Sequence, residues 1–130
     1  MSLEANKTII RKAIEALNKK DLVPLDQFIA LDYVDHTNQI QGIENLRQFY
    51  NRVFGDFPDF NRTIEDITAE GDEVWARSTI TGTAPTGKKA ELTSMNIFHI
   101  VDGKIVETWG GVIQKMVVPA TAGELAKQLL

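Results

Sequence analysis

The stretch that decides the fold runs from Phe98 to Trp109 and has the sequence FHIVDGKIVETW. Apolar and polar residues alternate on both sides of Asp102-Gly103, a pair that is typical of a tight turn between antiparallel strands. The alternation continues outward from the turn, so we predict one long strand over residues 88–101 and another from residue 104 to about residue 118. A hairpin of two long strands is therefore the centre of the expected fold.

The pairing register of this hairpin decides which side chains share a face of the sheet, because a slip of one residue turns every side chain over. A two-residue turn at Asp102-Gly103 would place Trp109 beside Asn96. A type I turn with a bulge at Gly103 would shift the pairing by one. Five residues would then share a face: Asn96, Phe98, Val106, Thr108 and Gly110. We favour this bulged register, in which Gly103 has a positive φ.

Two further strands are predicted before the hairpin, one over roughly residues 60–70 and one in which residues 73–80 alternate, with a turn at Gly71-Asp72 between them. A tight connection through Pro85 links them to the hairpin. Four strands that follow one another in this way predict an antiparallel meander.

The earlier part of the chain has its apolar residues at helical spacing instead. A first helix carries a stripe of Ile9, Ile10, Ala13, Ile14 and Leu17. A second, short helix is expected from Asp21 and a third after Gly42, and residues 31–38 between them are expected to be irregular or briefly extended. A capping-box pattern at residues 121–124 predicts a last short helix.

Together these elements predict a single α+β domain over residues 1–130, with N-terminal helices packed on a curved antiparallel sheet. Helices on the concave face of such a sheet leave a space at its wide end. We expect a ligand to bind in that space.

The composition limits the classes of function. The 130 residues contain no cysteine and carry a formal net charge of −4. A chain without cysteine has no disulfide and no thiolate chemistry, which fits a reducing compartment, so we expect a cytoplasmic protein. There is no basic cluster and no long apolar run, so we predict neither a nucleic-acid partner nor a membrane. The first residues also lack the pattern of a signal peptide.

Five short sequences occur in the order found in a known family. They are DYVDH at residues 32–36, FPD at 57–59, EGDEV at 70–74, PTGK at 85–88 and FHIVDGKIVETW at 98–109. With them the chain resembles the SnoaL-like polyketide cyclases, of the fold group of nuclear transport factor 2 and ketosteroid isomerase. The resemblance covers nearly the whole chain and implies a cone-shaped α+β barrel. It is weaker evidence of activity, because this fold hosts enzymes, binding proteins and transport factors.

The resemblance implies a mechanism whose central residue is missing here. In the family cyclases the last strand reads Glu-His-Trp-Asp, and the Asp is the general acid–base of an aldol ring closure. The matching positions are Glu107, Thr108, Trp109 and Gly110. Glycine has no proton acceptor, so Gly110 cannot fill that role, and we expect the cavity to be deeper at this position. The loop before Pro85 is also shorter than in the family, which predicts a trimmed pocket rim.

His36 is the candidate catalytic residue. The resemblance implies a pocket histidine at this position, and an imidazole can accept or donate a proton near pH 7. The alternative is a structural histidine bonded to Asp35 or to the backbone. His99 alternates away from Asn96 and is expected on the outer face of the sheet. Glu107 is expected to pair with a cation such as Arg77.

Five residues are expected to contact the ligand: Tyr33, Asn96, Phe98, Thr108 and Gly110. We predict no metal site, because the two histidines have no nearby carboxylate at ligand spacing, and no cofactor, because no glycine-rich loop precedes a helix. Two hypotheses remain open. The first is a SnoaL-like cyclase, isomerase or hydrolase that acts on a small apolar carbonyl compound. The second is a non-catalytic binding or interaction domain that uses the same cavity. In both, the resemblance implies a homodimer through the exposed sheet face.

Overall fold

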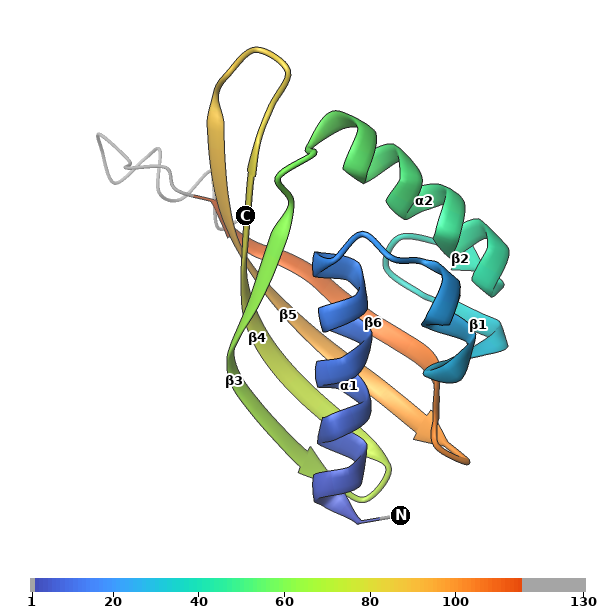
Figure 1. Ribbon diagram of the computed structural model, residues 1–130. Helices are drawn as coiled ribbons and strands as arrows, with labels where there is room; N and C mark the ends of the chain where they lie inside the picture. Colours follow the sequence, from blue (N-terminus) through green and yellow to red (C-terminus); the bar gives the residue numbers. More distant parts are fainter. Residues whose placement is uncertain (1, 116–130) are drawn as a thin grey trace.

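Six strands form one sheet in the order β2-β1-β6-β5-β4-β3 (Figure 1). The computed structural model describes residues 2–115, so the helix predicted from residue 121 lies outside the described residues. The strands are β1 (Ile29–Asp35), β2 (Ile40–Gln41), β3 (Asn61–Glu70), β4 (Glu73–Thr83), β5 (Lys89–Val101) and β6 (Lys104–Lys115). The helices are α1 (Leu3–Asn18), the short 3-10 helix η1 (Val23–Gln27) and α2 (Ile43–Asp56). The α+β class predicted from the sequence is confirmed.

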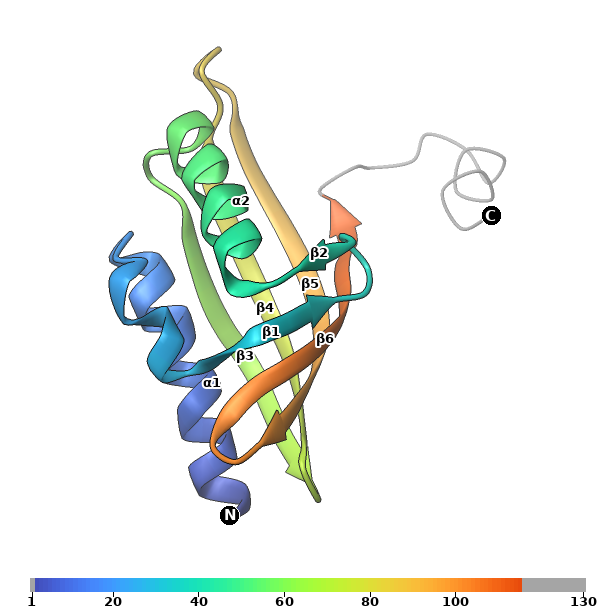
Figure 2. The same ribbon diagram turned by 90° about the vertical axis from the view of Figure 1, so that its right-hand side faces the viewer.

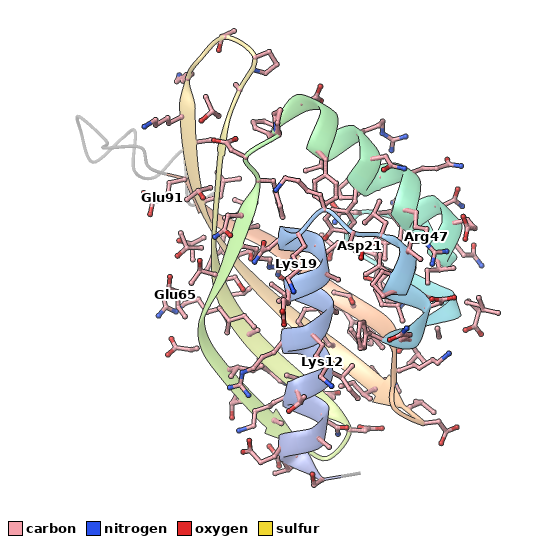
Figure 3. All side chains as sticks on the ribbon, viewed as in Figure 1. Lys12, Lys19, Asp21, Arg47, Glu65 and Glu91 are labelled. Carbon is pink, nitrogen blue, oxygen red and sulfur yellow. The ribbon has the colours of Figure 1, made fainter. Side chains whose placement is uncertain are left out.

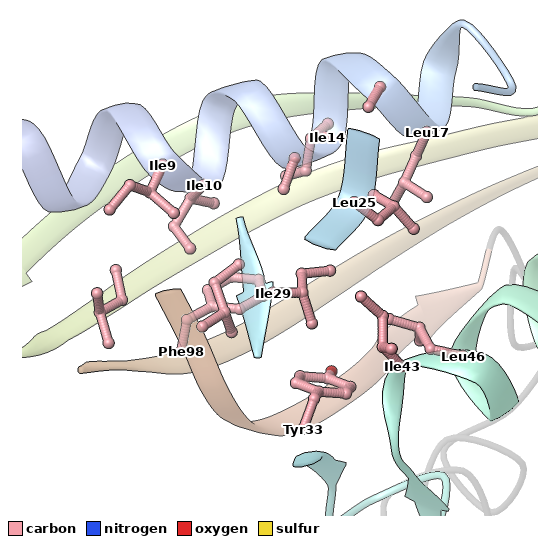
Figure 4. Packing of buried hydrophobic residues seen from close by; sticks show 14 of the residues in the cluster. Ile9, Ile10, Ile14, Leu17, Leu25, Ile29, Tyr33, Ile43, Leu46 and Phe98 are labelled. Carbon is pink, nitrogen blue, oxygen red and sulfur yellow. The ribbon is translucent and has the colours of Figure 1, made fainter. Parts of the chain in front are cut away.

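Helix α1 forms where its apolar stripe predicted it, and it packs on the sheet above β3. The Ser2 side chain caps the helix by accepting a hydrogen bond from the Ala5 backbone N–H. The stripe is buried, and Ile10 has no exposed surface. Figure 4 shows these side chains packed toward Leu25 and Ile29. Each buried aliphatic side chain of this kind stabilises the fold by roughly 1.5–3 kcal/mol.

The segment after α1 differs from the prediction. Only a 3-10 helix forms at residues 23–27, and the chain is already extended from Ile29 as β1. β1 pairs in parallel with β6, so the sheet is mixed and has six strands instead of an antiparallel meander of four. The local spacing could not show this, because the partner strand lies about seventy residues later in the chain.

The hairpin of β5 and β6 pairs Asn96 with Gly110 and Phe98 with Thr108, in line with the favoured register, but its turn differs from the predicted one and Val106 does not pair. Val101 lies opposite Lys104, and Asp102 and Gly103 both have positive φ, so the turn has two residues. The extra residue is Val106, where the register shifts between the Ile100–Ile105 and His99–Glu107 pairs. Asn96 therefore lies opposite Gly110, as the favoured register predicted, while the expected bulge at Gly103 was wrong.

Both helices lie on the same side of the sheet (Figure 2). α2 starts after Gly42, whose φ of 86° is accessible to glycine at little cost. Only Ile43 and Leu46 of α2 are fully buried, whereas Phe49, Tyr50 and Val53 are half-buried. α2 therefore roofs the concave face without filling the space beneath it. None of the helices in residues 2–115 is long and apolar enough to cross a membrane.

Candidate functional site

A cavity of about 300 Å³ lies between α2 and the concave face of the sheet. Its roof comes from α2, through Leu46, Phe49, Tyr50 and Val53. Its floor comes from the sheet, and most of the lining is apolar, including Phe57, Phe60, Ile80, Leu92 and Phe98. Such a cavity is suited to a small molecule with a large apolar surface.

Arg62 brings a positive charge into this cavity. Its backbone is fixed to α1, because the Asn18 side chain accepts from the Arg62 N–H at 2.7 Å and donates to its carbonyl at 2.8 Å. The Arg62 side chain crosses toward β5, and Nη2 donates to Asn96 Oδ1 and, at 3.4 Å, to Ser94 Oγ. Only 9% of the residue is exposed. The charged residues labelled in Figure 3, such as Lys12 and Glu65, lie on the outside of the molecule instead.

The charge of Arg62 has no counterion within residues 2–115. No carboxylate there lies within 4 Å of its guanidinium, and its enclosed Nε has no hydrogen-bond partner among those residues. A buried charge is normally paired, because its transfer out of water is costly. This guanidinium is therefore the polar group of the cavity with the most unused bonding capacity.

Asn96 and Thr108 lie beside this charge on the adjacent strands β5 and β6. Asn96 accepts from Arg62 through Oδ1, and its amide NH₂, which makes no hydrogen bond within residues 2–115, can donate to a ligand. Thr108 is 4% exposed, and its hydroxyl makes no hydrogen bond within 3.5 Å in residues 2–115, although it lies close enough to the Tyr33 phenol to oppose the rise in pKa that burial causes in that group. Both residues line the cavity, and so do Tyr33 and Phe98, the other two side chains that were expected to contact the ligand.

Two tyrosines add hydroxyl groups to the cavity lining, Tyr33 from β1 and Tyr50 from α2. Burial raises the pKa of Tyr33 and that of Tyr50 well above the usual range, although the Arg62 charge acts in the opposite direction on Tyr50. Both phenols are therefore neutral near pH 7. They can donate or accept a hydrogen bond, but they cannot balance a positive charge.

Asp35 is a carboxylate in the cavity lining. It is 7% exposed, and three N–H donors of the following loop hold it. Oδ1 accepts from the backbone N–H groups of Thr37 and Asn38, both at 3.0 Å, and Oδ2 accepts from the Asn38 amide at 2.9 Å. The carboxylate is thus fixed in orientation, with Oδ2 as its less occupied oxygen.

We expected Gly110 to contact the ligand, but it is not among the residues that line the cavity. Its φ is 110°, and a Cβ atom added there would lie 2.0 Å from the Met95 carbonyl oxygen. The missing side chain therefore points into the backbone of β5 and does not deepen the cavity, which is lined by Gly111 instead. The Gly110 N–H donates to Thr37 Oγ1 at 2.8 Å. The backbone of β6 is thus shaped for glycine at this position.

His36 also lies apart from the cavity. Its side chain is 40% exposed, and its ring stacks on Trp109 at 4.9 Å between centroids with an interplanar angle of 8°. Nε2 lies 3.5 Å from Glu107 Oε1. His36 was expected in the pocket, and this expectation is wrong. Its catalytic role stays a prediction, and the observed position of the side chain does not support it.

His99 belongs to the same exposed group of side chains. It contacts Asp72 at 2.8 Å through Nε2 and Glu107 at 3.2 Å through Nδ1. The hydrogen bond with Asp72, followed by that with Glu107, raises the pKa of His99. Glu107 thus pairs with histidines and not with Arg77, which pairs with Asp66 at 2.6 Å. Within residues 2–115 no three His, Cys, Asp or Glu side chains are arranged to hold a metal ion.

Sequence analysis missed Arg62 and Asp35. A signal for Arg62 was present, because β3 pairs Arg62 with Ile80, and the inward face of β4 is marked by Val74, Ala76 and Ser78. An arginine on an inward position of a strand is uncommon unless it is paired. Asp35 gave no such signal, because the strand that carries it was not predicted.

The sequence profile of the SnoaL-like polyketide cyclases matches residues 7–118. No curated protein matches the chain. Among solved structures, IdmH of Streptomyces antibioticus is 28% identical, with a TM-score of 0.74 over 95% of this chain and 97% of its own. AclR of Streptomyces galilaeus is 25% identical, with a TM-score of 0.75 over 85% of this chain and 90% of its own. The profile match covers most of the chain, and the chain therefore belongs to the SnoaL-like polyketide cyclase family.

Proposed function

We propose that the protein binds a small, largely apolar carbonyl compound in the cavity under α2. The observation that carries the proposal is an apolar cavity in which the free donors gather at one place, around Arg62 and Asn96. The apolar lining holds the body of the ligand, and the Asn96 amide and the Arg62 guanidinium donate to its oxygen. These donors are worth more here than in water, because the surroundings have a low dielectric constant.

The test is to fill the cavity and to measure binding of a neutral probe, 2-acetonaphthone, by isothermal titration calorimetry. Val53→Trp adds a large side chain to the half-buried cavity roof. Arg52→Trp adds the same side chain at the neighbouring exposed position of α2 and serves as the matched control. We expect the wild type and Arg52→Trp to bind the probe and Val53→Trp to bind at least about tenfold more weakly. Equal binding by both variants, or no binding by the wild type, would contradict the proposal.

A second candidate function is proton transfer on the bound compound, and the carboxylate of Asp35 favours it. A base removes a proton from the carbon next to a carbonyl, and donors at the carbonyl oxygen stabilise the enolate that forms. Asp35 would be the base, while Arg62 and Asn96 would stabilise the oxygen. Gly110 offers no group for this step, and His36 faces Trp109, so we assign the step to Asp35.

Exchange of the methyl protons of 2-acetonaphthone with D₂O, followed by NMR, tests this candidate. We expect the wild type to accelerate exchange and Asp35→Asn to lose the acceleration, by about 100-fold or more. His36→Gln is the comparison variant and should exchange as the wild type does. Exchange at the buffer rate with the wild-type protein would leave binding as the function.

We also propose that two copies associate through the outer face of the sheet. Trp75, Ile97 and Trp109 form an apolar row across β4, β5 and β6, and the two tryptophans are 43% and 36% exposed. Exposed apolar patches of this kind mark interaction sites. In sedimentation velocity we expect the wild type to be a dimer, Trp75→Glu a monomer, and Val23→Glu, altered on η1, a dimer. A monomeric wild type would overturn this proposal.

A further inference from the structure

We propose that the natural ligand carries a carboxylate, and that this carboxylate pairs with Arg62 inside the cavity. The inference rests on the proposed function, because it needs a ligand in the cavity, and it adds the ligand's charge. It is argued from the charges of the lining and from the bonding capacity that the lining leaves unused.

The guanidinium of Arg62 has five N–H donors, and the protein uses few of them. Nη2 donates to Asn96 and Ser94, while Nε has no acceptor within residues 2–115. Nη1 also makes no hydrogen bond there, and it is not enclosed as Nε is. Nη1 is therefore the nitrogen through which the guanidinium can meet a ligand.

The acceptors that Arg62 does have are both neutral. An amide oxygen and a hydroxyl orient the guanidinium but do not cancel its charge. Tyr33 and Tyr50 do not cancel it either, because both are neutral phenols. An apolar cavity around a charge of this kind favours a ligand that brings the opposite charge.

Among residues 2–115, Asp35 is the one carboxylate of the cavity lining, and its hydrogen bonds hold it to the loop after β1. Three N–H donors of Thr37 and Asn38 occupy its oxygens, and it makes no ion pair with Arg62 within 4 Å. Arg62 is thus held in place by Asn18, Asn96 and Ser94 without a direct anionic partner in residues 2–115. A carboxylate suits this guanidinium better than a neutral oxygen does, since charge-assisted hydrogen bonds are roughly twice as strong as neutral ones.

The experiment compares three probes of nearly the same shape, again by isothermal titration calorimetry near neutral pH. They are 2-naphthoate, which is anionic, and 2-naphthamide and 2-acetonaphthone, which are neutral. We expect the wild type to bind 2-naphthoate at least about tenfold more tightly than 2-naphthamide. In Arg62→Met the preference should fall to about twofold or less. 2-Acetonaphthone should bind this variant more weakly than the wild type, because it loses the Arg62 donor, but it still binds through the apolar lining and Asn96 and so reports an intact cavity.

The outcomes separate this inference from the proposed function. If 2-acetonaphthone binds and 2-naphthoate binds no more tightly than 2-naphthamide, the inference is overturned and the proposed function stands. If none of the three probes binds, the proposed function fails and the inference fails with it. The wild-type comparison decides the matter even if Arg62→Met does not fold, and Arg62→Lys, which keeps the charge, should retain part of the preference.

Discussion

Each face of the sheet carries a group of polar side chains. The two groups differ in how many of their hydrogen-bonding atoms have partners. On the concave face, Arg62, Asn96 and Thr108 are at least nine-tenths buried and keep donors or acceptors without partners among residues 2–115. On the outer face, Asp72, His99, Glu107 and His36 form a continuous chain of contacts, and their side chains are 29–65% exposed.

This difference shows where to look for a ligand site. The outer group contains both histidines of the chain, and histidine is the most common side chain in acid–base catalysis. Its members already satisfy one another, and water surrounds them. The residue types of the concave group are less common in acid–base catalysis. However, the group is buried, and some of its hydrogen-bonding atoms have no partner in residues 2–115. Buried polar groups without partners within residues 2–115 are unusual, and they mark the concave face as the candidate ligand site.

The largest effect is expected at Gly110, the point where β6 is shaped for glycine. Gly110→Ala should destabilise the protein by about 3 kcal/mol, because its Cβ would lie against the Met95 carbonyl oxygen at a positive φ. Thermal and denaturant unfolding measure this. The matched control is Gly111→Ala, whose Cβ has Thr37 Cγ2 at 3.8 Å as its nearest contact. Equal stability of the two variants would show that the strand accepts a side chain at both positions.

A smaller effect on stability is expected at Thr108. The same substitution separates the contribution of this residue to stability from its contribution to ligand binding. Thr108→Val should stabilise the ligand-free protein by about 1 kcal/mol, because it removes a buried hydroxyl that has no partner in residues 2–115. It should also weaken binding of 2-acetonaphthone, since the hydroxyl lines the cavity. Ser78→Ala is the control, because the buried Ser78 hydroxyl also has no partner in residues 2–115 but lies outside the cavity lining. It should stabilise the protein and leave binding unchanged, and loss of binding in both variants would contradict the assignment.

The smallest effect is expected in the outer group, as a dependence of stability on pH. The folded protein raises the pKa of His99 above 6.5, so the stabilisation is fully present below that value and is lost as the pH rises through the folded pKa. Its partners Asp72 and Glu107 have lowered pKa values, so their contribution is lost in acid as the pH falls through those values. The stabilisation is therefore largest between the two limits.

His99→Gln should accordingly lower the Tm slightly at about pH 6 and hardly at all at about pH 9. Arg77→Gln is the control, because it removes an ion pair that contains no histidine, and it should show the same difference at both values. If His99→Gln lowered the Tm equally at both values, the histidine would not stabilise the fold through its charge.

The sequence predicted the elements whose patterns are local. The stripe of α1, the start of α2 at Gly42 and the strands β3 to β6 follow from spacing and turn residues that lie close together in the chain. The strand β1 does not follow from local spacing, because its extended conformation depends on pairing with the distant strand β6. The bulge at Val106 was also missed, since nothing in the residues around it distinguishes it from the glycine bulge that was expected.

The site was predicted in part, for the same reason. Tyr33, Asn96, Phe98 and Thr108 line the cavity, and the positions of Asn96, Phe98 and Thr108 follow from alternation in the hairpin. His36 and Gly110 were placed by resemblance to the family, and the structure puts both side-chain positions elsewhere. Arg62 became visible only when the sheet brought β3 beside Ser94 and Asn96 in space.

The most direct test of the account is the dissociation constant of 2-naphthoate for two variants, Arg62→Met and His36→Ala, measured side by side by isothermal titration calorimetry. The account predicts that Arg62→Met weakens binding at least about tenfold and that His36→Ala stays within about twofold of the wild type. The opposite result, loss of binding in His36→Ala with wild-type binding in Arg62→Met, would place the ligand with the outer group and contradict the account.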